Sequence, residues 1–233
     1  MKLWWMSRAD RRRWKTAKNI ADLGELMALW LEGAIASWPG YQPNCGPEEE
    51  TQHLIPTLAA LNRAGILTVG SQPGETGTGY DGLWWEQRAA LDAFAADWAT
   101  YIRLRSAVED AGFIVTVHDP RTGLYDGPVP VTTRDGAAHT QFGGRLNSGD
   151  MRALWPVISK EAYTDVSTAI HLSIAAPEFG TAGERLWHVL DRFTGRLDEA
   201  DDPWAPAAPV IVFEDEAAAY FDQARESGPE GRR

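Results

Sequence analysis

The chain has 233 residues, of which 44% are hydrophobic, and this is enough for a substantial core in one globular domain. Its formal net charge of -11 at pH 7 argues against nucleic acid or an anionic membrane surface as a partner. The single cysteine, Cys45, excludes an internal disulfide bond, and no apolar run is long enough for a signal peptide or a membrane span. We therefore expect a cytoplasmic protein.

The first third of the chain predicts two helices and a strand. Apolar residues at helical spacing predict a helix from Ile20 to Ile35. After a loop rich in proline and glycine, Pro47 and three glutamates indicate the start of a second helix with an apolar face at Leu54, Leu58 and Leu61. Gly65 is typical of a helix end, and the run from Ile66 to Val69 predicts a buried strand.

The remainder mixes helices and strands without strict alternation. Helices are expected over 84–94, 98–111, 150–160 and 184–193, and strands over 113–117, 129–133 and 169–175. The strands over 113–117 and 129–133 should form a hairpin, and a linker over 197–209 should lead to a last strand over 210–213 and a short helix. We predict an α+β fold with mixed β-sheets flanked by helices. The expected organisation is a basic N-terminal arm over 1–19, one domain over 20–224 and a disordered tail over 225–233.

Two familiar motifs give weak signals. Gly77-x-Gly79-x-x-Gly82 matches the dinucleotide fingerprint in its letters and stands between a predicted strand and a predicted helix. However, Pro73 and several residues separate it from the strand, where the fingerprint needs a tight turn, so a flexible or ligand-covering loop is the preferred interpretation. The five histidines show no H-E-x-x-H motif and no zinc-like spacing with Cys45, so no metal site is expected.

A polar group occurs where the second helix begins and the following strand ends. Helix and strand are joined by one tight turn, so they should lie antiparallel and bring Thr51 opposite Ser71. With Glu50 and Thr68, these residues predict a hollow with one carboxylate and three hydroxyls, which suits an amino-acid moiety. The alternative is a capping network in which Glu50 and Thr51 only complete the helix start.

Residues 49–73, EETQHLIPTLAALNRAGILTVGSQP, resemble the regulatory domain of eukaryotic-type methylenetetrahydrofolate reductase, with its ET-x-L, LNR-x-G and LT-x-NSQP pattern. Neighbouring pieces agree in order: RW at 13–14, GEL at 24–26, LEG at 31–33, WP at 38–39 and QRAALDAF at 87–94. The ordered resemblance extends from about Arg13 to His118, and only fragments follow it. The family's catalytic flavin barrel has no counterpart, so neither flavin nor reductase activity is implied.

The resemblance implies a ligand, S-adenosylmethionine or S-adenosylhomocysteine. Position by position, it implies that Glu50 holds the ligand's α-ammonium and that Thr51, Thr68 and Ser71 hold its amino-acid end. Thr140 would add a polar contact, and Ser148 is a further candidate. Two departures stand out: the asparagine of NSQP is Gly70 here, and the family's interdomain linker is replaced by a short basic arm.

Three functions remain open at this point. The first is a stand-alone sensor or regulatory module that reports the ligand to a protein partner, with Trp84 or Trp85 as an aromatic face that favours the sulfonium. The second is an enzyme that uses S-adenosylmethionine as a substrate for transfer or cleavage, with acid-base candidates Tyr80, Asp81, His118 and His139. The third is an interaction domain that kept the fold and lost the ligand.

Overall fold

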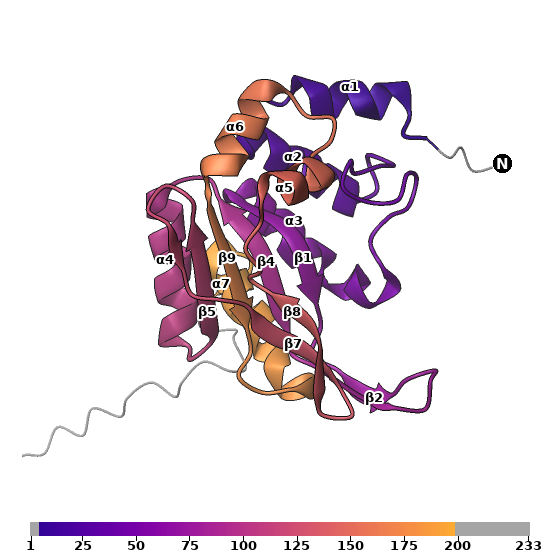
Figure 1. Ribbon diagram of the computed structural model, residues 1–233, viewed down its shortest axis with the longest axis vertical. Coiled ribbons are helices and arrows are strands. Elements are labelled where there is room, and N and C mark those ends of the chain that lie inside the picture. Colours follow the sequence, from indigo (N-terminus) through magenta and orange to yellow (C-terminus); the bar gives the residue numbers. More distant parts are fainter. Residues whose placement is uncertain (1–4, 199–233) are drawn as a thin grey trace, which may run out of the picture. The chain divides into compact units, whose positions relative to one another are not determined.

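The computed structural model describes residues 5–198 and confirms the α+β fold, with two antiparallel sheets flanked by helices (Figure 1). The larger sheet has five strands in the order β1 (Ile66–Gln72), β4 (Ala90–Ala95), β9 (Ile170–Ala175), β5 (Ile114–Asp119) and β6 (Leu124–Tyr125). The smaller sheet has four strands in the order β2 (Thr76–Thr78), β3 (Trp84–Gln87), β7 (Val129–Arg134) and β8 (Ala137–Phe142).

The helices gather mainly on one face of the larger sheet. Those near the N-terminus are α1 (Arg8–Thr16), α2 (Ile20–Leu31), the short 3₁₀ helix η1 (Glu49–Leu54) and α3 (Ile55–Arg63), of which α2 and α3 pack against each other and against β1. The later ones are α4 (Trp98–Asp110), α5 (Ser148–Leu154), α6 (Lys160–Thr168), η2 (Gly180–Glu184) and α7 (Arg185–Thr194). Within residues 5–198, none of the helices is both long and apolar enough to cross a bilayer.

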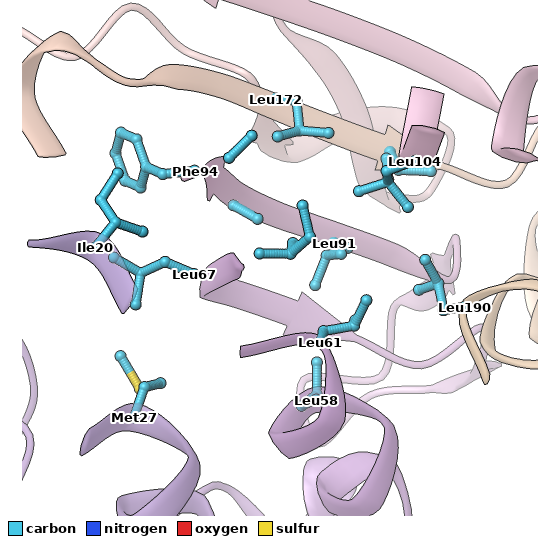
Figure 2. Packing of buried hydrophobic residues seen from close by; sticks show 14 of the residues in the cluster. Ile20, Met27, Leu58, Leu61, Leu67, Leu91, Phe94, Leu104, Leu172 and Leu190 are labelled. Atoms are coloured by element: carbon cyan, nitrogen blue, oxygen red, sulfur yellow. The ribbon is translucent and has the colours of Figure 1, made fainter. Parts of the chain in front are cut away.

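The main core fills the space between these helices and the larger sheet. Alternation along β4 and β9 turns Leu91, Leu172 and Ile174 toward the helices, where they are fully or almost fully buried. Figure 2 shows Leu61 of α3 and Leu190 of α7 in the same packed cluster. Burial of these side chains is the main stabilising contribution to the fold.

The smaller sheet covers the opposite face of the larger one. Ala90 and Ala175 form a second apolar cluster there with Val129 and Val131 of β7. Gln72 crosses this interface, because its amide nitrogen donates to the carbonyl oxygens of Arg88 (3.0 Å) and Val131 (2.8 Å). The two sheets are thus joined by polar as well as apolar contacts.

Two predictions about the sheets are wrong, and the helix expected over 150–160 is wrong in extent, because α5 ends at Leu154 and α6 begins only at Lys160. Residues 84–94 form β3 and β4 rather than a helix, and residues 129–133 pair with β3 and β8 rather than with 113–117. β4 is buried on both faces, so its apolar residues lack the alternation that reveals a strand. The glycines 77, 79 and 82 consequently lie in the β2–β3 hairpin, with no helix start after them to bind a pyrophosphate.

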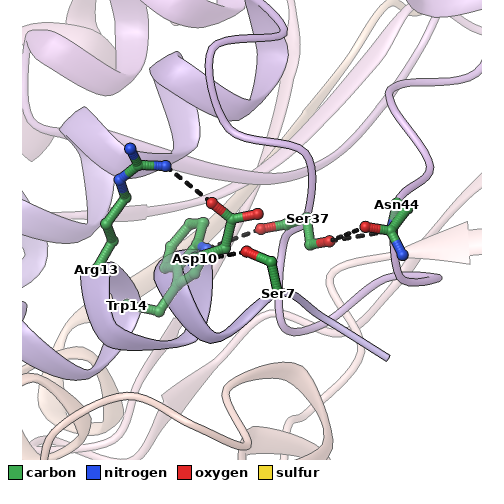
Figure 3. Close-up of polar contacts among 6 residues, drawn as sticks. All are labelled: Ser7, Asp10, Arg13, Trp14, Ser37 and Asn44. Carbon is green, nitrogen blue, oxygen red and sulfur yellow. Dashed lines mark hydrogen bonds and ion pairs between the residues drawn. The ribbon is translucent and has the colours of Figure 1, made fainter. Parts of the chain in front are cut away.

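The N-terminal residues are integrated into the fold from Arg8 onward. Residues 8–16, expected in the basic arm, form α1, whose Trp14 is fully buried in the main core. The Trp14 indole nitrogen donates to the carbonyl oxygen of Ser37 at 2.8 Å, and the Asn44 backbone N–H donates to the Ser37 hydroxyl at 2.9 Å. Figure 3 shows these residues side by side. Helix α1 therefore anchors the loop over 37–44. The predicted strand over 210–213 and the tail over 225–233 lie outside the described residues.

Candidate functional site

A cavity of about 330 Å³ lies between the N-terminal helices and the edge strand β1. Its walls come from α2, the loop after α2, η1, α3, β1 and the end of α5. This volume is near the lower end of the range of about 300–1,000 Å³ that is typical of small-molecule sites. Three of the predicted site residues line it: Thr51, Thr68 and Ser71.

The two hydroxyls of β1 reach the cavity because the strand contains a bulge. Thr68 pairs with Ala93 and Ser71 pairs with Leu91, so an advance of three residues along β1 matches an advance of two residues along β4. The register shifts between Thr68 and Gly70, which leaves Val69 as the extra residue. Without this insertion, residues three apart would point to opposite faces of the sheet.

Thr68 is held by a buried asparagine at the end of α3. The Asn62 side-chain nitrogen donates to the Thr68 hydroxyl at 2.7 Å, and the Thr68 backbone N–H donates to the Asn62 side-chain oxygen at 3.1 Å. Since the Thr68 oxygen acts as an acceptor in this contact, its own proton can be donated into the cavity. Asn62 belongs to the LNR segment of the sequence, but sequence reasoning assigned it no role.

Aromatic side chains form another wall of the cavity. Trp30 of α2 lies with its ring centroid 5.3 Å from that of Trp38 and 6.0 Å from that of Tyr41. Trp38 and Tyr41 have nearly parallel rings, 13° apart, with centroids separated by 6.3 Å. The Trp30 indole nitrogen donates to the Cys45 carbonyl oxygen at 3.1 Å, which fixes the loop against α2. We call Trp30, Trp38 and Tyr41 the aromatic group.

Glu48 supplies an acidic side chain to the lining of this cavity. The hydroxyl of Tyr41 donates a hydrogen bond to the Glu48 carboxylate, so loop and glutamate are joined at the cavity wall. Among residues 5–198, no lysine, arginine or histidine contributes to the lining. The cavity therefore offers hydroxyls, aromatic rings and negative charge.

Glu50, the carboxylate predicted for the site, lines a neighbouring hollow instead. This hollow has a volume of about 220 Å³ and is shared with Glu75 and with Trp85 of the β2–β3 hairpin. Glu50 is exposed as a residue, but partial burial of its carboxyl raises its pKa, and repulsion from Glu75 and Glu48 raises it further. Glu50 and the three hydroxyl residues are thus neighbours in the chain or the fold, but they do not line the same cavity.

Thr140 and Ser148 are both exposed and are not part of the cavity lining. Thr140 lies on β8 opposite Thr132, and Ser148 begins α5, whose other end supplies Leu154 to the cavity. The resemblance was only fragmentary in this region. A local signal that would place either residue was therefore lacking.

The acid-base candidates also lie away from the cavity lining. Tyr80 is fully exposed, and Asp81 forms an ion pair with Arg134 and accepts from the Trp85 indole at 3.2 Å. The His139 ring packs against Trp85 with centroids 4.8 Å apart. Asp81 and His139 therefore make structural contacts within the smaller sheet. The neighbouring Trp84, like Tyr80, is exposed.

His118 belongs to a separate polar group between the two sheets. It pairs across β5 and β9 with the buried His171, whose ring nitrogen lies 3.0 Å from the Asp92 carboxylate, and Ser173 also donates to Asp92. Burial lowers the pKa of His118, and the nearby His171 and Arg145 lower it further, against an opposing effect of Asp119. Within the described residues, no cluster of three or more histidine, cysteine or acidic side chains could hold a metal ion.

Together, the fold and this geometry define an α+β protein with a ligand-sized cavity that is lined in part by an aromatic loop. The chain belongs to a family described as a domain of unknown function, DUF6919, whose model matches residues 9–195. That match includes every element that lines the cavity. A search of the curated proteins finds no match to this chain.

Proposed function

We propose that the chain binds S-adenosylmethionine or S-adenosylhomocysteine in the cavity and acts as a stand-alone sensor or regulatory module. The observation that carries the proposal is the convergence of Thr51, Thr68 and Ser71 on one cavity. These hydroxyls come from two separate elements, η1 and β1, and they are the residues for which the resemblance implies contacts with the ligand's amino-acid end.

The chemistry of the cavity supports an amphipathic ligand of this kind. Hydroxyls accept from an ammonium and donate to a carboxylate, and a lining without basic side chains leaves the carboxylate to the hydroxyls and backbone N–H groups. The aromatic group offers apolar surface for the rest of the molecule. Glu50 lines the neighbouring hollow, so the hydroxyls would bind the ligand's α-ammonium, and Glu48 is the carboxylate in the cavity lining.

Sensing would follow from the number of elements that the ligand joins. A molecule in the cavity would contact α2, the loop that carries Trp38 and Tyr41, η1 and β1 at once. Differential binding to one arrangement of the loop would shift the protein toward that arrangement. A protein partner that contacts the loop would then read the ligand state.

Isothermal titration of the full chain with both ligands tests the proposal. Ser71→Ala and Thr51→Val each remove one hydroxyl and should weaken binding by roughly two- to tenfold, the equivalent of about 0.5–1.5 kcal/mol. Ser167→Ala, on α6 away from the cavity, is the matched control and should leave the affinity unchanged. The absence of heat with either ligand at high micromolar concentration would reject the proposal.

The same sample distinguishes binding from catalysis. After incubation with S-adenosylmethionine, chromatography should recover the ligand intact, because Tyr80, Asp81, His118 and His139 all lie outside the cavity lining. Formation of methylthioadenosine, S-adenosylhomocysteine or homocysteine would instead show that the ligand is consumed.

A further inference from the structure

The aromatic group and Glu48 suggest which of the two ligands the cavity prefers. We propose that Trp30, Trp38, Tyr41 and Glu48 form a cation subsite, so that the cavity favours ligands with a positive sulfonium or ammonium centre over their neutral analogues. This inference rests on the proposed function and assigns a role to four residues for which the resemblance implies none. For the two ligands considered, it predicts preference for S-adenosylmethionine over S-adenosylhomocysteine.

Ring geometry is the first support. The three centroids lie between 5.3 and 6.3 Å from one another, and all three side chains line the same cavity. Trp30 and Trp38 are 6% and 7% exposed and Tyr41 is half-buried, so the two tryptophan rings are largely shielded from water. A cation over an aromatic face is attracted by the negative ring quadrupole, most strongly for tryptophan, and the attraction grows when water is excluded.

Charge is the second support. Glu48 brings a carboxylate to the lining, and Tyr41 holds it there by a hydrogen bond, so the negative charge and the rings belong to one connected unit. Within the described residues, the lining contains no cationic side chain that already occupies the aromatic group. Arg88, Arg103, Arg134, Arg145 and Arg185 do lie over aromatic rings elsewhere in the fold, but over rings outside this cavity.

Polar layout is the third support. The hydroxyls of Thr51, Thr68 and Ser71 lie on η1 and β1, whereas the aromatic group lies on α2 and the following loop. If the amino-acid end of a ligand lies among the hydroxyls, an alkylated cationic centre close to that end would lie near the aromatic group. In S-adenosylmethionine this cation is the sulfonium, which S-adenosylhomocysteine lacks.

The affinities of three related ligands test the subsite in the full chain. S-adenosylmethionine and sinefungin, which has an ammonium in the place of the sulfonium, should each bind about tenfold more tightly than S-adenosylhomocysteine. Glu48→Gln keeps the side-chain shape and removes the charge, so it should reduce this preference while leaving S-adenosylhomocysteine affinity nearly constant. Glu49→Gln makes the same change of net charge beside the cavity, and it should keep the preference.

Tetramethylammonium is the probe that separates the two proposals, with tryptophan fluorescence as the readout. Quenching of the fluorescence in the wild type, and loss of this quenching in Glu48→Gln, would support the cation subsite. If none of the three nucleosides binds in the same samples, the proposed function is rejected and the cation subsite is not. Equal affinity for the three nucleosides, with no response to Glu48→Gln, would overturn the subsite and leave the proposed function standing. No response to any of the probes would overturn both.

Discussion

Thr68 and Ser71 present their hydroxyls to the same cavity although three positions separate them along β1. The bulge at Val69 makes this possible, because it adds the one residue that restores both side chains to the helix-covered face. The same insertion leaves Gly70 beside Phe142 and Asp92 on the other face, where a side chain at residue 70 would meet the Phe142 ring at 3.3 Å. Glycine at this position therefore fits the close approach of the smaller sheet.

Asn62→Ala should destabilise the fold and weaken ligand binding together. The substitution removes both hydrogen bonds to Thr68 and the bond to the Leu58 carbonyl oxygen, and it leaves the buried Thr68 N–H without its partner. An unsatisfied buried group costs about 1–3 kcal/mol, so chemical denaturation should show a loss of that order. A free energy of unfolding within about 0.5 kcal/mol of the wild type would contradict this role, since that is the usual range for surface changes.

Gln72→Leu should weaken the attachment of the smaller sheet to the larger one. Leucine has a similar volume but leaves the carbonyl oxygens of Arg88 and Val131 and the hydroxyl of Thr132 without their shared partner. We expect a loss of about 1–3 kcal/mol in the free energy of unfolding. In a double-mutant cycle with Thr132→Val, the two losses should be less than additive, because Gln72 and Thr132 contact each other at 3.2 Å.

Much of the fold could be predicted from the chain because several elements have clear periodicity and boundaries. The helix beginning at Ile20, the strand beginning at Ile66 and the strand near 170–175 were all predicted from local pattern. β4 was not, because it is buried on both faces and carries apolar residues at every position except Asp92, so its pattern fits a helical period equally well. The partner of residues 129–133 was also missed, because strand pairing between distant segments depends on packing that no local turn signal reveals.

The candidate site, like the fold, was predicted only in part. Thr51 and Ser71 could be brought together from the tight connection between helix and strand, and they do line one cavity. The aromatic group was missed because Trp38 and Tyr41 lie in a loop without periodicity, which is positioned by distant contacts such as that of Trp14 with Ser37. The segment that carries the family resemblance thus combines cavity residues with residues, such as Asn62 and Gln72, that fix the surrounding structure.

Gly24→Ala should destabilise the protein, although alanine is normally the better residue within a helix. A methyl group at residue 24 would lie 2.4 Å from the Asn62 carbonyl oxygen, so α2 and α3 would have to separate. Overpacking of this kind costs about 1–3 kcal/mol, against a usual gain of about 0.5–1 kcal/mol for this replacement in a helix. Thermal unfolding should show a lower Tm, whereas Gly144→Ala, where a methyl group would meet nothing within 4 Å, should have little effect.

Glu50→Gln should stabilise the unliganded protein at neutral pH. Partial burial of the carboxyl and the neighbouring Glu75 and Glu48 raise the pKa of Glu50 above its ordinary value, so the folded state disfavours the ionised form. Ionisation of Glu50 therefore lowers the free energy of unfolding of the wild type. This loss develops as the pH rises from the ordinary pKa near 4.5 through the higher pKa of the folded state. Thermal unfolding at pH 7 should give a higher Tm for the variant, and the difference should narrow below pH 4.5. A difference that stays constant across this interval would rule out the electrostatic cause.

His118 should make the fold less stable in mild acid. Burial, His171 and Arg145 lower its pKa in the folded state, so the unfolded chain binds a proton more readily as the pH falls through the ordinary histidine value of about 6.5. The free energy of unfolding should thus decrease from pH 7.5 toward the lower, folded pKa and then level off with respect to this group. His118→Gln cannot take up the proton, so its stability should fall less over the same interval. Loss of the ring contact with Tyr125, whose centroid lies 5.8 Å away, would lower the stability of the variant equally at every pH, and the diagnostic quantity is therefore the slope. Parallel curves for the two proteins would show that His118 does not contribute to the acid sensitivity.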